Sequence, residues 1–171
     1  MNRYIESETL ELKERYTDTI SKEIVSFLNS SGGTILIGIK DDGTVIGVDK
    51  IDEVLRKISD IITAQIEPNP QDEITSELKF DEGKTVIAIN IKKGQNHIYC
   101  QKKYGFSSAG CTIRIGTTCK EMTSEQIKIR YEKKFIDTEY MLKRRSHSSD
   151  LSFRELKIYY SEKGYRLEDK S

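Results

Sequence analysis

Four charged side chains within the first 41 residues are of the types that metal-assisted cleavage of phosphodiesters requires. Glu11 and Lys13 alternate with two leucines in residues 9–13, which predicts a half-buried strand that carries both charges on one face. Glu6 lies just upstream, and Asp41 lies at the tip of a predicted hairpin. If that hairpin packs beside the strand, the three carboxylates converge and can bind Mg²⁺ or Mn²⁺ through oxygen. Lys13 would then stabilise charge on the phosphate during the reaction.

The same residues also have a simpler interpretation as surface charge. The chain has 28 Asp and Glu residues among 171, so chance groupings of acids are expected. Glu6 and Glu11 are five residues apart, so on one straight strand their side chains would face opposite sides. Convergence on a metal therefore requires a bend within residues 7–9, which the sequence does not reveal. From spacing alone we favour surface charge over catalysis.

Basic side chains are concentrated in one segment, although the formal net charge of the chain is zero. Residues 1–91 carry 10 basic and 18 acidic side chains, whereas residues 92–120 carry six basic ones and no acid. A polyanion would be attracted to this segment, where Tyr99 and Tyr104 could stack on unpaired bases. The alternatives are a solvated hairpin face and, for Arg114, an ion pair with a neighbouring acid. The candidate phosphate contacts are Lys92, Lys93, Lys102, Lys103, Arg114 and Lys120.

Other classes of function lack the residues that they need. No run approaches the roughly 18 apolar residues that span a bilayer, and the polar N-terminus is unlike a secretory signal, so we expect a cytoplasmic protein without membrane contact. The three cysteines and two histidines have no zinc-ligand spacing. The glycine-rich residues 29–43 lack the lysine of a phosphate-binding loop. We expect that nucleic-acid binding needs no cofactor, whereas a nuclease would need Mg²⁺ or Mn²⁺.

Hydrophobic periodicity predicts an α+β fold with a mixed, mainly antiparallel sheet of short hairpin-connected strands. Two or three helices cover this sheet, and a helical appendage follows at the C-terminus. We expect one domain over residues 1–134, and a linker with the helical start of a downstream region over residues 135–171. The predicted helices lie at 20–28, 51–66, 123–134 and 152–164, and the predicted strands at 9–13, 34–39, 44–48, 74–80, 85–91, 98–102 and 112–115.

Several motifs, taken in their order along the chain, resemble the Schlafen AlbA-like domain family. Residues 6–13, ESETLELK, resemble its ESxxxEFK opening, and residues 24–39, IVSFLNSSGGTILIGI, resemble its glycine-rich strand. The resemblance covers about residues 5–132. Further matches follow in order at residues 40–48, 113–118 and 122–127.

The resemblance implies a nucleic-acid-binding domain at the N-terminus of a bacterial transcriptional regulator or divergent ATP-binding protein, with an ATPase-like region following it. Animal Schlafen proteins cleave structured RNA with three acids, which match Glu6, Glu11 and Asp41 here, next to Lys13. Leu12 stands where the family usually has Phe, a tolerable change in volume. The nuclease core of those proteins has two lobes and this chain has room for one, so a homodimer would be needed to rebuild their clamp.

We therefore predict a nucleic-acid-binding domain that contacts DNA or RNA phosphates through the basic segment. The first alternative is a Schlafen-type endoribonuclease that depends on Mg²⁺ or Mn²⁺, with Glu6, Glu11 and Asp41 as metal ligands and Lys13 supporting the phosphate. The second alternative is a dimerisation or interaction module for a downstream ATPase-like region. Between binding and catalysis, we favour binding.

Overall fold

The computed structural model describes residues 4–145, with side chains up to residue 134. The chain divides into two units, Met1–Lys133 and Lys134–Ser171, and the fold below is that of the first. Its longer elements are β1 (Leu10–Lys13), α1 (Ile20–Leu28), β2 (Gly32–Ile37), α2 (Ile51–Asp60), β4 (Ile74–Asp81), β5 (Lys84–Lys92), β7 (Thr112–Ile115), β8 (Thr118–Glu121) and the start of α3 (Ser124–Arg145). Its shorter elements are a π-helical turn (Ile61–Gln65), β3 (Ile66–Glu67), a 3₁₀ turn (Gln71–Glu73) and β6 (Cys100–Gln101).

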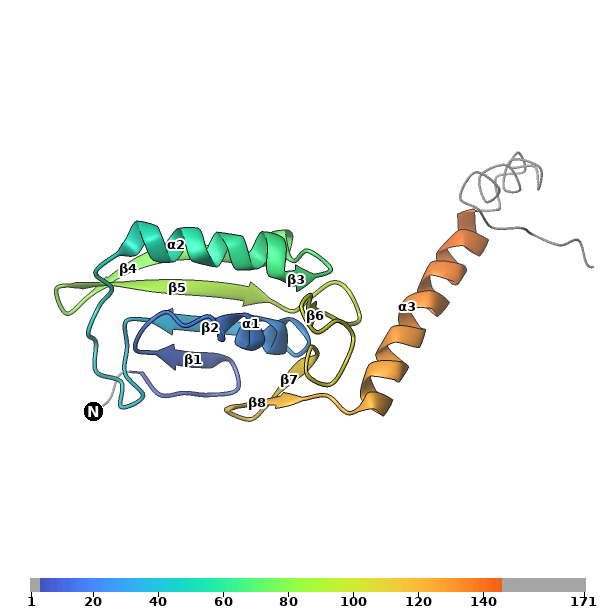
Figure 1. Cartoon of the computed structure of the whole chain (residues 1–171), viewed down its shortest axis with the longest axis horizontal. Coiled ribbons are helices and arrows are strands. Elements are labelled where there is room, and N and C mark those ends of the chain that lie inside the picture. Colours follow the sequence, from blue (N-terminus) through green and yellow to red (C-terminus); the bar gives the residue numbers. More distant parts are fainter. Residues whose placement is uncertain (1–3, 146–171) are drawn as a thin grey trace, which may run out of the picture. The chain divides into compact units, whose positions relative to one another are not determined.

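A mixed sheet in the order β1-β2-β5-β4 forms the centre of the unit (Figure 1). β1 and β2 are parallel, with α1 as the crossover between them, whereas β2, β5 and β4 are antiparallel neighbours. The hairpin of β4 and β5 turns through Glu82 and Gly83, whose φ angles of 49° and 75° are both positive. Such a turn matches the right-handed twist of the strands that it joins. These features confirm the predicted α+β fold with a mainly antiparallel sheet.

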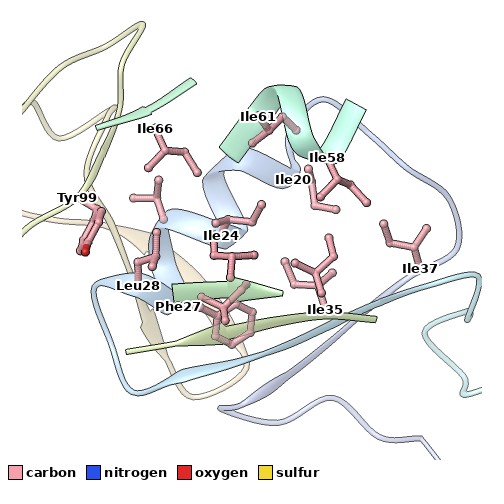
Figure 2. Close-up of a cluster of buried hydrophobic side chains, with 14 of the residues drawn as sticks. Ile20, Ile24, Phe27, Leu28, Ile35, Ile37, Ile58, Ile61, Ile66 and Tyr99 are labelled. Atoms are coloured by element: carbon pink, nitrogen blue, oxygen red, sulfur yellow. The ribbon is translucent and has the colours of Figure 1, made fainter. Parts of the chain in front are cut away.

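Apolar side chains alternate between the two faces of the sheet, so each face has its own core. On one face, Ile35 and Ile37 of β2 pack with Ile20 and Ile24 of α1, the spacing predicted for that helix (Figure 2). The same cluster includes Ile58 of α2, together with isoleucines of β5. The other face buries a smaller cluster of Leu12, Leu36, Ile39, Val45, Val86 and Ala88.

The predicted hairpin over residues 34–48 is only half formed. Its first strand exists as β2, but residues 44–48 make a single bridge, between Ile39 and Val45. The backbone N–H groups of Ile46 and Gly47 both donate to the Gly38 carbonyl oxygen, at 2.8 and 2.9 Å. A Cβ atom on Gly38 would lie 2.9 Å from the Gly47 carbonyl carbon, so this crossing requires glycine. The chain therefore crosses itself here instead of continuing a strand pair.

Residues 98–102 and 112–115, predicted as two short strands of a hairpin-connected sheet, do not pair with each other. β6 pairs with β3, and β7 pairs with β8, a strand that the sequence analysis did not predict. Gly116 follows β7 with φ of 58° and allows a tight turn, so β7 folds back on the residues next to it. The long loop before β7 instead bonds to itself, as when the Cys111 N–H donates to the Ser107 carbonyl oxygen at 2.8 Å.

Helix α3, predicted from residue 123, begins with a capping box. The Thr123 N–H donates to Gln126 Oε1 at 2.9 Å, and the Gln126 N–H donates to Thr123 Oγ1 at 3.2 Å. The helix runs to Arg145 and not to residue 134, so the first residues of the region predicted as linker and downstream helix, 135–145, continue α3. The predicted helix at 152–164 lies outside the described residues. Within residues 4–145, no helix is long and apolar enough to cross a membrane.

Gly33 gives a test of how tightly α1 packs on the sheet. A Cβ atom there would press on the Phe27 ring and lie 2.7 Å from the Thr9 carbonyl oxygen. We expect Gly33→Ala to lower the free energy of unfolding by about 1–3 kcal/mol, since neither neighbour can move without disturbing the core. Urea denaturation measures this change, with Ser31→Ala, at an exposed neighbouring position, as the control. Equal stability of the two variants would contradict the packing described.

Candidate functional site

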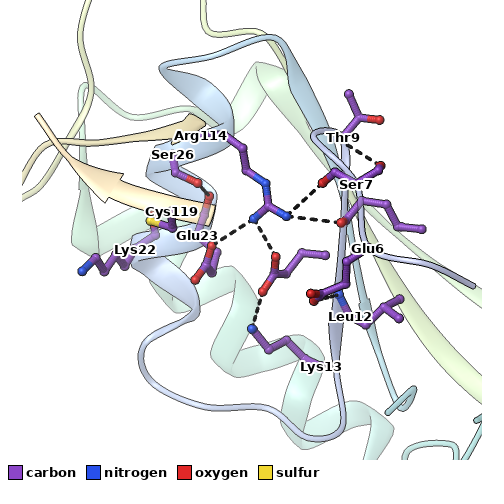
Figure 3. A network of polar contacts seen from close by, with 12 residues as sticks. Glu6, Ser7, Thr9, Leu12, Lys13, Lys22, Glu23, Ser26, Arg114 and Cys119 are labelled. Carbon is purple, nitrogen blue, oxygen red and sulfur yellow. Dashed lines mark hydrogen bonds and ion pairs between the residues drawn. The ribbon is translucent and has the colours of Figure 1, made fainter. Parts of the chain in front are cut away.

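A tight turn brings the two N-terminal acids to the same strand. The backbone N–H of Ser7 donates to the Leu10 carbonyl oxygen at 3.0 Å, and the N–H of Leu10 donates back at 3.4 Å. This is the bend that convergence requires. After it the chain reverses, and Glu6 Oε1 accepts a hydrogen bond from the Leu12 N–H at 3.2 Å. Glu6 therefore lies beside β1, with its carboxylate on the backbone of that strand (Figure 3).

Glu11 lies between two cations and is nearly fully buried. Its Oε2 atom is 2.6 Å from Arg114 Nη1, and its Oε1 atom accepts a hydrogen bond from Lys13 Nζ. The contact with Arg114 is an ion pair and not a directed hydrogen bond, because Glu11 Oε2 has no hydrogen-bond partner. Arg114 Nε, on the same guanidinium, has none either. Since Arg114 and Lys13 each neutralise one of its oxygens, Glu11 forms a structural ion-pair network with them.

Arg114 connects β7 to the turn, to β1 and to α1, and its side chain has no solvent-exposed surface. Its Nη2 atom donates to the carbonyl oxygens of Ser7 and Leu10 at 3.0 and 3.3 Å. Its Nη1 atom also lies 3.4 Å from Glu23 Oε2 of α1. The guanidinium is 4.7 Å from the centroid of the Phe27 ring, within the range of a cation–π contact. Of the two roles considered for Arg114, the structure has the ion pair, and burial keeps phosphates from it.

The network shifts the titration of its outer members. Burial raises the pKa of Glu23 above its ordinary value of 4.5, and the Glu11 carboxylate raises it further, against the opposing effect of Lys13, Arg114 and Lys22. Burial lowers the pKa of Lys13, but the hydrogen bond to Glu11 and the charges of Glu11, Glu23 and Glu6 outweigh burial and raise it above 10.5. Burial is therefore the main cause of the raised pKa of Glu23, and three nearby cations oppose it.

The three acids of the nuclease prediction are not gathered at one point. Asp41 is exposed in the loop after β2, where its neighbour Asp42 accepts a hydrogen bond from the Thr44 N–H at 2.9 Å. Among the residues that the structure describes, no three His, Cys, Asp or Glu side chains form a group that could hold a metal ion. Glu11 is occupied by Arg114 and Lys13, so a metal would have to displace them.

The predicted nucleic-acid contacts fall into two groups. Tyr99 is fully buried, where its O–H donates to Glu73 Oε1 at 2.9 Å and its backbone exchanges hydrogen bonds with Asn29. Its ring is therefore core and offers no surface to a base. Tyr104 is 48% exposed. The predicted lysines are all exposed, namely Lys92, Lys93, Lys102, Lys103 and Lys120.

A groove of about 870 Å³ gathers part of the exposed group at the start of α1. Lys102, Lys103 and Tyr104 line it together with Lys22 of α1, and Asp18 and Glu121 also contribute. Lys22 Nζ lies 3.7 Å from Glu121 Oε1, and Ser21 Oγ donates to Gln101 Oε1 at 3.1 Å, which connects α1 to the segment of Lys102. Lys22 was missed by the sequence analysis, because no local pattern indicates that α1 meets a segment about 80 residues later in the chain.

Removing Arg114 should be among the most damaging single changes in the molecule. Arg114→Met removes the cation that the buried Glu11 and the partly buried Glu23 share, and breaking a buried ion pair by removing one partner costs about 3–5 kcal/mol. We expect a fall of that order in the free energy of unfolding, measured by urea denaturation. Lys120→Met removes a cation from exposed β8 nearby and should change stability by less than about 0.5 kcal/mol. A similar small effect of both substitutions would contradict the role of Arg114.

The raised pKa of Glu23 gives a pH dependence with a definite sign. The folded protein holds this proton more tightly than the unfolded chain, so the group favours folding below pH 4.5, and its contribution is lost as pH rises through the raised pKa. Glu23→Gln cannot lose a proton. We therefore expect the variant to gain stability relative to the native chain as pH rises from about 4 to 7. Urea unfolding at several pH values measures the difference, and a pH-independent difference would contradict the assignment.

The DIP2311 protein from Corynebacterium diphtheriae has a similar fold, with a TM-score of 0.50 and 20% identity over 67% of this chain. This chain covers 22% of that protein's chain. The N-terminal domain of a RecG-related protein from Nitrosomonas europaea gives a TM-score of 0.45 and 18% identity, over 67% of this chain and 82% of its own.

No curated protein matches the chain. The Schlafen AlbA_2 family, however, matches residues 6–123, well over half of the sequence. The match starts at Glu6, includes the turn, β1, both helices of the core and the β7–β8 hairpin, and ends at the capping residue of α3. The chain therefore belongs to the Schlafen AlbA_2 family.

Proposed function

We propose that this chain binds nucleic acid through the groove at the start of α1, as the DNA- or RNA-contacting domain of a bacterial transcriptional regulator. The observation that carries the proposal is the meeting of Lys22 with Lys102, Lys103 and Tyr104 in that one groove. Membership of the Schlafen AlbA_2 family is consistent with a nucleic-acid-binding domain. The buried network does not take part, because its charges neutralise one another inside the fold.

The groove has the chemistry that a phosphate backbone needs. Lysine ammonium groups bind phosphates without reading sequence, and such binding weakens steeply with salt. Lys103 Nζ lies 5.2 Å from the centroid of the Tyr104 ring. A phosphate on Lys103 would thus be close to a base stacked on Tyr104, which favours strands with unpaired bases. Asp18 and Glu121 line the same groove and Glu121 pairs with Lys22, so attraction is strongest at Lys102 and Lys103.

The double variant Lys102→Ala/Lys103→Ala tests the groove. We expect weaker binding to duplex DNA and to tRNA, and a slope of log affinity against log salt that is smaller by about 2, one unit for each lost phosphate contact. Fluorescence anisotropy at several salt concentrations measures both. The matched control is Lys50→Ala/Lys57→Ala, which removes the same charge next to and within α2.

Equal losses in the two double variants would contradict a specific groove and leave only general attraction to positive charge. If the native chain binds neither ligand, the interaction-module alternative takes precedence.

Incubation of the chain with duplex DNA or tRNA, in the presence of Mn²⁺ or of EDTA, tests the nuclease alternative. Asp41→Asn is the informative variant there, because Asp41 is exposed and its loss leaves the buried network intact. Metal-dependent cleavage that disappears in Asp41→Asn would favour the nuclease.

A further inference from the structure

One edge of the central sheet is long and open in the described part of the chain. β4 is the outer strand of the order β1-β2-β5-β4, and β5 is the neighbour with which it pairs. The two-residue turn after β4 makes Asp81 and Lys84 a hydrogen-bonded pair, and such pairs alternate along a hairpin. The backbone groups of Ser76, Leu78 and Phe80 therefore point away from β5. They form a row of donors and acceptors to which another strand can bond.

The side chains along this edge are unusual for an open strand. Leu78 is 53% exposed and Phe80 is 78% exposed, and they lie on the same face as the buried Ile74. On the opposite face, Glu77 and Lys79 form an ion pair at 3.3 Å. An exposed strand edge with apolar side chains tends to pair with another strand. The opposite charges of Glu77 and Lys79 additionally restrict which strand can pair with β4, because that strand must carry complementary charges at the facing positions.

The sequence of β4 is complementary to itself when it runs antiparallel. A two-fold axis perpendicular to the sheet keeps the helices of both copies on one face, so each residue meets a residue of the same face. With the axis at Leu78, Leu78 meets Leu78 of the second copy, and Glu77 meets Lys79 twice. The leucines form a hydrogen-bonded pair, and the charges fall in non-bonded pairs, where side chains are closest.

Neighbouring registers lose this complementarity. An axis at Glu77 places Glu77 opposite itself, and an axis at Lys79 places Lys79 opposite itself and Glu77 opposite Asp81. Like charges directly opposite each other destabilise a strand pair. An axis at Phe80 pairs Lys79 with Asp81 but overlaps the turn and shortens the ladder. Of these registers, only that at Leu78 combines paired charges with a ladder over residues 75–81.

We propose that a second copy of this chain pairs with β4 in this register, giving a continuous eight-stranded sheet across a two-fold axis. Each copy contributes the same edge, so the interface is closed and leaves no free β4. The outer strands of the combined sheet are then the two β1 strands, which are only four residues long. The groove at the start of α1 has no residue in β4, so this interface is independent of the proposed nucleic-acid binding.

Charge reversal at the edge tests the pairing on the full chain. Glu77→Lys and Lys79→Glu each place like charges opposite each other, and we expect each to raise the dissociation constant of the dimer by on the order of tenfold or more. An equimolar mixture of the two variants restores opposite charges in every pair and should dimerise like the native chain. The double variant Glu77→Lys/Lys79→Glu should do the same. Glu125→Lys, at an exposed position of α3, is the control.

Sedimentation equilibrium over a range of concentrations measures these constants, and two fluorescent labels detect the mixed dimer. Recovery in the mixture also shows that both variants are folded, since misfolded chains would not pair. A native chain that stays monomeric at every concentration overturns the proposal. So does a dimer whose dissociation constant is the same in all variants, or a mixture of the two single variants that fails to associate.

Discussion

Arg114 carries a fixed positive charge into the interior, where its side chain does not reach solvent. A buried guanidinium is stable only if carboxylates and carbonyl oxygens replace its water. Glu11 and Glu23 supply the charge, and Ser7 and Leu10 supply the carbonyls. These groups belong to the N-terminal turn, β1 and α1, whereas the arginine comes from β7. The ion pair therefore determines how four separate segments meet.

Because buried Arg114 needs compensating groups, some charged side chains of this domain serve the fold and others remain available for binding. Glu11 has the residue type of a metal ligand, but both of its oxygens neutralise cations within the fold. Lys102 and Lys103 are outside the network and line a groove that is open to solvent, which Lys22 also lines while pairing with Glu121. The charges that can meet a polyanion are thus those that the core does not use. An acid-to-alanine change at Glu11 would affect the fold itself, which limits what it reveals about catalysis.

Local features of the fold were predictable from the sequence, and long-range ones were not. The alternation around Glu11, the helical spacing of α1, the turn after β4 and the Thr123 capping box each lie within a few residues, so their patterns are visible. The turn at residues 7–10 is a local exception, because it has no glycine, proline or asparagine and is marked only by Ser7, whose Oγ accepts a hydrogen bond from the Thr9 N–H at 3.3 Å. The burial of Tyr99 depends on Asn29, 70 residues away, and on Glu73. No local pattern carries that information.

The hydrogen bond from Arg114 to the Ser7 carbonyl oxygen spans 107 residues. During synthesis from the N-terminus, the turn and β1 emerge from the ribosome long before their arginine partner exists. Until then, Glu11 and Glu23 have only Lys13 and Lys22 as nearby cations, so their full burial is less favourable. The first strand to be translated is therefore among the last to be fixed in place. A nascent chain arrested before residue 114 lacks the four contacts that Arg114 makes with the N-terminal turn, β1 and α1, so its N-terminal segment is held less firmly.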